Sequence, residues 1–223
     1  YQTLDEVFAG VPMENRAPDK ASHNSQVNTS PGDIWFVNVN GDDVINDFDR
    51  TVIGNPQPDF IFGFNNQFGY KNFDLSIFFQ GSYGNDIWNG VRVSHEGMES
   101  TYNQFTSTLN RWNGEGSSNT MPRAIYADPN RNNRASTRWV EDGSYLRLKN
   151  LTIGYRFTQD WLKKIGAKSL RLYLSFDNLW TLTNYSGLDP EVGLWGLDYG
   201  IYPTSRVYML SLIHISEPTR LRR

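Results

Sequence analysis

The chain has 223 residues, a formal net charge of −3, no cysteine and an aromatic content of 14%. The lack of cysteine excludes a disulfide framework and thiolate metal sites, and the small net charge argues against a nucleic-acid-binding surface. No apolar run approaches the ~18 residues of a membrane-spanning helix, so only β-strands would place this chain in a membrane.

Residues 1–58 lack a long period and are predicted to form a surface loop region. Within it, residues 38–49 read NVNGDDVINDFD. Oxygen-bearing side chains fall at positions 1, 3, 5, 9 and 12 of a twelve-residue calcium loop, with a carbonyl at position 7. Position 1 is Asn rather than Asp, and position 6 is Asp43 rather than Gly, so the alternative is an Asx-rich turn without an ion. The candidate ligands for calcium, the one cofactor suggested, are Asn38, Asn40, Asp42, Val44, Asn46 and Asp49.

The stretch from Asp59 to Tyr83 predicts an antiparallel hairpin, because apolar residues recur at every second position on both sides of Lys71 and Asn72. Each alternating run is about 11 residues, whereas strands of soluble proteins are usually about 5–6. A tilted strand that crosses a bilayer needs about 9–11. The hairpin alone leaves open a long hairpin of a soluble β-sandwich. The residues expected to face lipid are Phe60, Phe62, Phe64, Leu75 and Ile77, with Asn65, Gln67 and Ser76 facing a lumen.

Three further strands are predicted after a span of about 60 residues without a strand-length period. They cover 144–157, 169–180 and 205–212. Leu172 and Leu174 are expected on the lipid side and Ser175 on the lumen side. Counting every second residue back from Leu151 places Arg147 and Lys149 on the apolar face, where they would stand above the hydrocarbon.

The predicted connections alternate in length, as they do between the two sides of an outer-membrane barrel. Short ones fall at 70–72 and 158–168, and long ones at 83–143 and 181–203. The short turns are therefore expected in the periplasm and the long loops outside the cell. Five strands do not close a barrel, since the smallest common ones have about eight. The predicted fold is all-β, one wall of an antiparallel transmembrane β-barrel with long external loops.

Four segments resemble the C-terminal part of the SusC/RagA-type TonB-linked outer-membrane transporters. They read GDIWFVNVNGDDVINDFDRTVIGNPQPDFIFGFNNQFGYKNFDLSIFFQGSYGNDIWN, VEDGSYLRLKNLTIGYRF, LRLYLSFDNLWTLTNYSGLDPEV and GLDYGIYPTSRVYMLSL. The resemblance implies that residues 59–212 are C-terminal barrel strands and loops of a larger protein. It also implies an N-terminal plug and a TonB-contact segment outside this chain, and import of oligosaccharides, peptides or similar nutrients. The implied partners are a SusD-type surface lipoprotein and the outer-membrane lipid that would surround the barrel.

No catalytic set is predicted, and the chain is not expected to be an enzyme. His95-Glu96 lacks the second histidine that a helical zinc site needs. Asp189 and Glu191 match the DPEV stretch of the family, and a loop-fixing or lining role is preferred to acid–base work. Aromatic residues in the long loops are candidates for stacking on sugar rings, with loop packing or lipoprotein contact as the alternative: Trp88, Trp112, Trp195 and Tyr199.

Two rival functions stay open at this point, a secreted carbohydrate-binding β-sandwich with a structural calcium and a passive porin. The last eleven residues, 213–223, are expected to be a non-native tail. Glu217 and Pro218 break the alternation, and proline donates no hydrogen bond to a ladder. The string SLIHISEPTR resembles translated sequencing-adapter sequence. The alternative is a genuine periplasmic tail.

Overall fold

The computed structural model describes residues 1–9, 29–42, 44–164 and 166–216. The chain divides into two compact units. The first unit comprises residues 1–55, 88–140 and 197–199, and the second comprises 56–87, 141–196 and the residues from 200 onward. Among the helices in the described part of the chain, none has the length and apolarity to cross a membrane.

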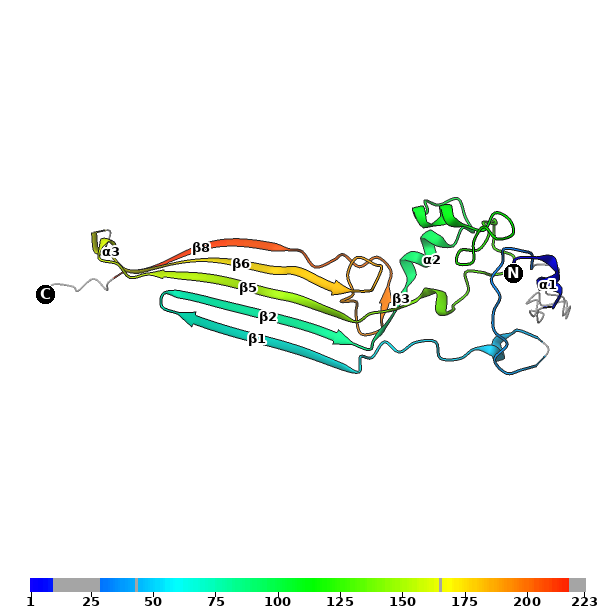
Figure 1. Ribbon diagram of the computed structural model, residues 1–223, viewed down its shortest axis with the longest axis horizontal. Helices are drawn as coiled ribbons and strands as arrows, with labels where there is room; N and C mark the ends of the chain where they lie inside the picture. The colour runs from blue at the N-terminus through cyan, green and yellow to red at the C-terminus, as the bar shows by residue number, and fades with distance from the viewer. Residues whose placement is uncertain (10–28, 43, 165, 217–223) are drawn as a thin grey trace. The chain divides into compact units, whose positions relative to one another are not determined.

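The second unit is built on one five-stranded antiparallel sheet, and the long ribbons of Figure 1 show it. Every neighbour in the sheet is antiparallel. In spatial order the strands are β1 (Phe60–Tyr70), β2 (Phe73–Tyr83), β5 (Tyr145–Phe157), β6 (Ala167–Thr183) and β8 (Val207–Ser216). The predicted hairpin is confirmed, since Tyr70 pairs with Phe73 across the two-residue turn. Lys71 has φ 53°, which lets the chain reverse there.

The register of the strands separates the sheet into two chemically different faces. Leu75, Ile153 and Leu174 stand opposite one another across three strands. One position along, Ser76, Thr152 and Ser175 do the same on the other face. Because successive side chains of a strand point to opposite faces, the apolar and polar residues collect into separate rows. We call these the apolar face and the polar face.

A bulge interrupts the alternation in β5 and corrects one prediction. Phe78 pairs with Asn150 and Phe79 with Leu148, so Lys149 is an extra residue. On the other side, β6 carries its own irregularity at Asn178, which has φ 52°. An inserted residue resets the period of two. Arg147, predicted on the apolar face with Lys149, therefore lies on the polar face with Thr181.

The last strand continues beyond its predicted end at Leu212. Ile213 pairs with Arg171 and Ser216 with Ala167, so four residues of the expected non-native tail belong to β8. Residues 217–223, which include the predicted break at Glu217 and Pro218, lie outside the described residues. The non-native origin of the tail stays a prediction.

Shorter elements occupy the connections. Helix α3 (Trp161–Lys164) lies between β5 and β6, and its Leu162 is buried. The long connection between β2 and β5 contains several elements, and β7 pairs in parallel with β3 at Trp88 and Leu197. The remaining elements are α1 (Leu4–Ala9), η2 (Asp47–Asp49), β3 (Asp86–Asn89), α2 (Gly90–Glu96), η3 (Thr106–Asn110), η4 (Thr137–Trp139), β4 (Val140–Asp142) and β7 (Leu197–Asp198).

The first unit has a small core in which a polar network replaces much of the apolar packing. Trp139 is fully buried. The carboxylate of Asp33, also buried, accepts two hydrogen bonds from Arg123 at 2.8 and 3.0 Å and a third from Asn132 at 2.9 Å. Burial of a carboxylate is costly unless hydrogen-bond partners such as these compensate for the lost water. The long loop region is therefore held by specific polar contacts between distant segments.

Candidate functional site

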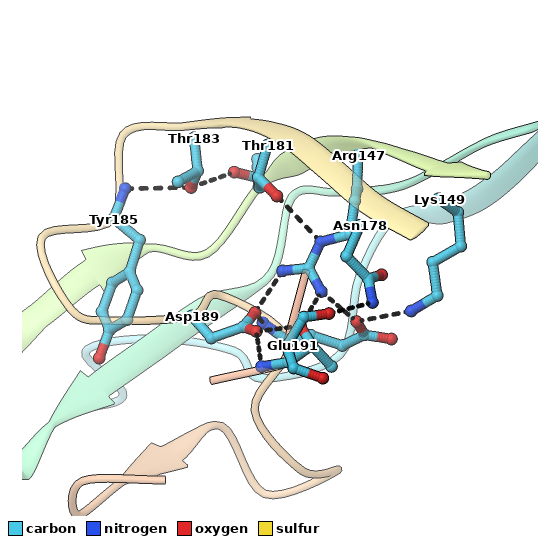
Figure 2. Close-up of polar contacts among 11 residues, drawn as sticks. Arg147, Lys149, Asn178, Thr181, Thr183, Tyr185, Asp189 and Glu191 are labelled. Atoms are coloured by element: carbon cyan, nitrogen blue, oxygen red, sulfur yellow. Dashed lines mark hydrogen bonds and ion pairs between the residues drawn. The ribbon is translucent and has the colours of Figure 1, made fainter. Parts of the chain in front are cut away.

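The most densely bonded polar cluster among the described residues surrounds Arg147 of β5. The side chain is only 3% exposed. Its Nε donates to Thr181 Oγ1 of β6 at 3.0 Å, and Nη2 donates to Asp189 Oδ1 at 2.5 Å. Nη1 donates to Glu191 Oε2 at 2.8 Å and to Thr204 Oγ1 at 2.5 Å. Figure 2 shows the guanidinium with Thr181, Asp189 and Glu191 around it. The four partners come from β6 and from the connection between β6 and β8.

Asp189 is the main acceptor of the cluster. Its carboxylate accepts hydrogen bonds from the backbone N–H groups of Glu191 at 2.9 Å and Thr204 at 3.0 Å, and from the Thr204 hydroxyl at 2.5 Å. Burial by itself raises the pKa of this carboxyl, but the bonds from Thr204 and Arg147 outweigh it and lower the pKa from 3.8 to about 2. Asp189 is therefore ionised at neutral pH.

The charges of the cluster balance. Lys149, at the β5 bulge, places its Nζ 3.2 Å from Glu191 Oε2. Two cations thus face two carboxylates, so the buried guanidinium has the paired environment that a charge away from water requires. Each nitrogen of the guanidinium and both oxygens of the Asp189 carboxylate have partners within the protein, which indicates a structural cluster and not an acid–base pair for chemistry.

These contacts favour the loop-fixing alternative for Asp189 and Glu191. Sequence reasoning missed Arg147 and Thr204. Thr204 belongs to no recognisable sequence motif. A count of every second residue places Arg147 on the wrong face, because the sequence does not reveal the bulge at Lys149. The one usable signal was the presence of an arginine in a strand that is otherwise rich in leucine.

The calcium-like segment folds as a series of turns closed by its own side chains. Asn38 Oδ1 accepts from Gly41 N at 2.8 Å, and Asp42 Oδ1 accepts from Val44 N at 2.9 Å. The two Asp49 oxygens accept from the backbone N–H groups of Val39 and Asn46 at 2.8 and 2.7 Å. The hydrogen bond from Asn46 is the main reason why the pKa of Asp49 lies below its ordinary value. Oxygens of Asn40 and Asn46 likewise accept from the backbone of Asp42 and Phe48.

The turn at position 6, Asp43, lies outside the described residues. Within the described ranges, no group of three or more His, Cys, Asp or Glu side chains is placed to hold a metal ion. The candidate ligands comprise two carboxylates, Asp42 and Asp49, together with amide and carbonyl oxygens, so calcium binding here stays a prediction. The hydrogen bonds are those of the Asx-rich turn that was its alternative.

The four predicted loop aromatics have different surroundings. Trp112 packs inside the first unit, where its Nε1 donates to Gln2 at 2.9 Å. A Cβ added at Gly32 would lie 2.4 Å from the Trp112 ring. Trp88 is half-buried in β3, while Trp195 and Tyr199 are 81% and 73% exposed. Trp88, Trp112 and Tyr199 belong to the first unit and Trp195 to the second.

His95 and Glu96 have separate structural partners. The His95 ring stacks on Phe105, with 5.0 Å between ring centroids. Glu96 forms an ion pair with Arg92 at 2.9 Å and accepts from the Ser107 hydroxyl at 2.7 Å. Both residues therefore help to fold the long connection between β2 and β5.

Comparison with known sequences gives consistent matches. No family model matches the chain. The chain is 38% identical over 195 residues to TonB-dependent receptor P3 of Formosa agariphila, covering 82% of the chain and 19% of that protein. It is 33% identical to TonB-dependent receptor P26 of the same organism, covering 81% and 19%. It is 29% identical to TonB-dependent receptor SusC of Bacteroides thetaiotaomicron, covering 83% and 18%. The chain spans about a fifth of the length of these curated relatives.

Comparison with solved structures agrees with the sequence matches. The RagAB peptide importer in its closed-closed state matches with a TM-score of 0.62 and 27% identity, over 72% of the chain and 18% of the importer chain. Its open-open state matches with a TM-score of 0.58 and 25% identity, over 70% and 17%. About seven tenths of the chain therefore have a counterpart in the fold of that importer.

Proposed function

Because this chain is homologous to the SusC/RagA-type TonB-dependent receptors of the outer membrane, we propose that its sheet is part of the wall of a nutrient-import barrel. These receptors are transporters and not enzymes. The observation that carries the proposal is the separation of the sheet into an apolar and a polar face. A wall between lipid and a lumen needs this arrangement on every strand.

The apolar face supports contact with lipid. It is large and exposed: Ile153, Leu174 and Leu210, from three successive strands, have exposed fractions of 42%, 43% and 67%. A soluble protein rarely exposes so broad a contiguous apolar surface. One row that crosses all five strands on this face is Phe68, Leu75, Ile153, Leu174 and Leu210.

Aromatic rings gather where an interface would meet this face. Near the short β1–β2 turn, Phe73, Tyr155, Phe157 and Trp161 make successive edge-to-face contacts, with 4.6, 4.7 and 6.3 Å between centroids. At the other end of the hairpin, Phe60 stacks on Tyr83 at 5.3 Å. Aromatic girdles at both boundaries are typical of outer-membrane barrels.

The rival readings fit less well. In a carbohydrate-binding β-sandwich, a second sheet would cover the apolar face, but the apolar side chains of that face remain exposed among the described residues. A passive porin is disfavoured because the matched relatives are TonB-dependent receptors.

Oligosaccharides, peptides or similar nutrients are the proposed substrates. A SusD-like lipoprotein and TonB, contacted through a part of the protein outside this chain, are the proposed partners.

Fractionation and uptake test this function. The complete transporter, expressed in a host with an outer membrane, should be recovered with that membrane and require detergent for extraction. Uptake of its oligomeric nutrient should stop when TonB is deleted or the proton gradient is collapsed. Recovery as a soluble protein would exclude the barrel, and uptake that persists without TonB would identify a passive porin.

A further inference from the structure

We propose that Arg147 is a positioning residue that latches residues 189–204 into a closed-neck loop on the polar face of the sheet. We call the side chains of Arg147, Asp189 and Thr204 the neck latch. The role assigned to the loop, a binding element presented in one conformation, rests on the proposed transport function. The latch itself is a statement about the local structure.

The neck is closed by the side chains at its two ends. Asp189 and Thr204 are fifteen positions apart, yet the Asp189 carboxylate accepts hydrogen bonds from both the backbone N–H and the hydroxyl of Thr204. Arg147 donates to both residues at once. Surface loops of about 6–16 residues with adjoining ends are compact units that often carry function.

The latch contacts the sheet where β5 and β6 are irregular. Arg147 also donates to Thr181 of β6. One residue beyond the neck, the Ser205 carbonyl accepts from Asn178 Nδ2 at 3.0 Å, and Asn178 is the left-handed residue of the β6 irregularity. Lys149, the extra residue of β5, contacts Glu191. The two strand irregularities thus aim side chains of β5 and β6 at the loop, as bulges commonly do.

Apolar packing contributes little to holding this loop. Leu194, Trp195 and Tyr202 are 84%, 81% and 89% exposed, whereas Asp189 is 7% exposed. A segment with few buried apolar contacts opens at low free-energy cost unless other contacts restrain it. The close approach of Gly196 to the Asp86 carbonyl oxygen and to the Pro56 side chain, and the short pairing of β7 with β3, add to the neck contacts.

Arginine is the residue that this geometry requires. All three nitrogens of the guanidinium donate hydrogen bonds, and together they reach four acceptors that lie in different directions. A lysine ammonium is a single point that does not reproduce this planar fork. Loss of Arg147 leaves the Asp189 carboxylate buried without its cation, which is strongly destabilising, whereas loss of Asp189 leaves Arg147 with Glu191 as its one anionic partner in the cluster. An ordered loop also loses less conformational freedom when a ligand binds.

The test uses the complete transporter in detergent, with Arg147→Lys, Asp189→Asn and Thr204→Val as variants. Arg156→Lys is the matched control, because it makes the same change on the same strand at an exposed position. Amide hydrogen exchange is expected to be about tenfold faster or more across residues 189–204 in the three variants, with β5 and β6 unchanged. The control should exchange like the parent protein.

Uptake kinetics give the second measurement. The half-saturating nutrient concentration should rise in the latch variants while the maximal rate holds, because a mobile loop weakens binding and leaves translocation intact. Unchanged exchange in the loop would overturn the latch. Loss of protection throughout β5 and β6 in all three variants, Thr204→Val included, would also overturn it, since the cluster would then be a general folding determinant. Absence of uptake in the parent protein would refute the transport function and leave the exchange result standing.

Discussion

Gly154 of β5 lies directly beneath the carboxylate of Asp74 of β2. A Cβ at residue 154 would come within 2.6 Å of both carboxylate oxygens. Asp74 needs this space because it forms an ion pair with Arg171 of β6, two strands away, across the middle strand. The absence of a side chain at residue 154 thus allows a charge pair to bridge three strands on the polar face.

Substitution of Gly154 by alanine is expected to weaken the ion pair, because the added Cβ would lie within 2.6 Å of both carboxylate oxygens and displace Asp74 from Arg171. The expected loss of stability is about 0.2–1 kcal/mol, the usual range for an ion pair accessible to solvent. Thermal unfolding of the detergent-solubilised transporter measures it. Gly69→Ala in β1 is the control, since nothing lies within 4 Å of a Cβ there; equal melting temperatures for the two variants would contradict the prediction.

The orientation of the two faces is tested by placing arginine on each. Phe62→Arg on the apolar face should impair assembly, since a cation on the lipid-facing side of a barrel is destabilising, by up to ~2–4 kcal/mol at the bilayer midplane. Asn65→Arg on the polar face should assemble normally. Heat-modifiable electrophoretic mobility of outer-membrane fractions reports assembly. If both variants assemble to the same extent, the assignment of the faces is wrong.

Weak calcium binding is expected in segment 38–49, with a dissociation constant of ~10⁻⁴–10⁻³ M, the range of extracellular modules. Titration calorimetry with millimolar calcium should show heat for the intact protein and none for Asp49→Asn. Asp47→Asn is the matched control, because Asp47 pairs with Arg50 and is not a candidate ligand. A parent protein that gives no calcium heat removes the site.

The neck latch should resist acid down to low pH. The pKa of Asp189 is lowered in the folded protein to about 2, below the ordinary value of ~3.9 for the unfolded chain. A lowered carboxyl pKa contributes stability that is complete above about pH 4 and is lost as pH falls toward 2. Hydrogen-exchange protection of the loop, relative to Asp189→Asn, should therefore be constant from pH 7 to about pH 5. It should then decline below about pH 4, and a decline already complete near pH 5 would contradict this.

The alternation of apolar residues predicts where the strands lie, but it does not predict which side chains contact one another. The run from Phe60 to Tyr83 alternates without interruption, so both strands and their turn follow from the sequence. In β5 the count holds from Asn150 onward and fails for the residues that precede Asn150, because the extra residue Lys149 exchanges the two faces. The partners of Arg147 are 34 to 57 positions away in the chain. No local pattern encodes such distances, so the cluster emerges only from the paired sheet.

The outermost strands of the sheet have a practical consequence for handling the isolated chain. Within the described residues β1 and β8 are both edge strands, each bonded to one neighbour only. Each edge thus offers a row of backbone N–H and C=O groups, and β1 adds exposed Phe64 and Phe68. Such an edge is a template for another copy. Expressed alone in the cytoplasm, the chain should form insoluble aggregates with a cross-β diffraction spacing near ~4.7 Å, and lysine placed on β1 should delay their appearance.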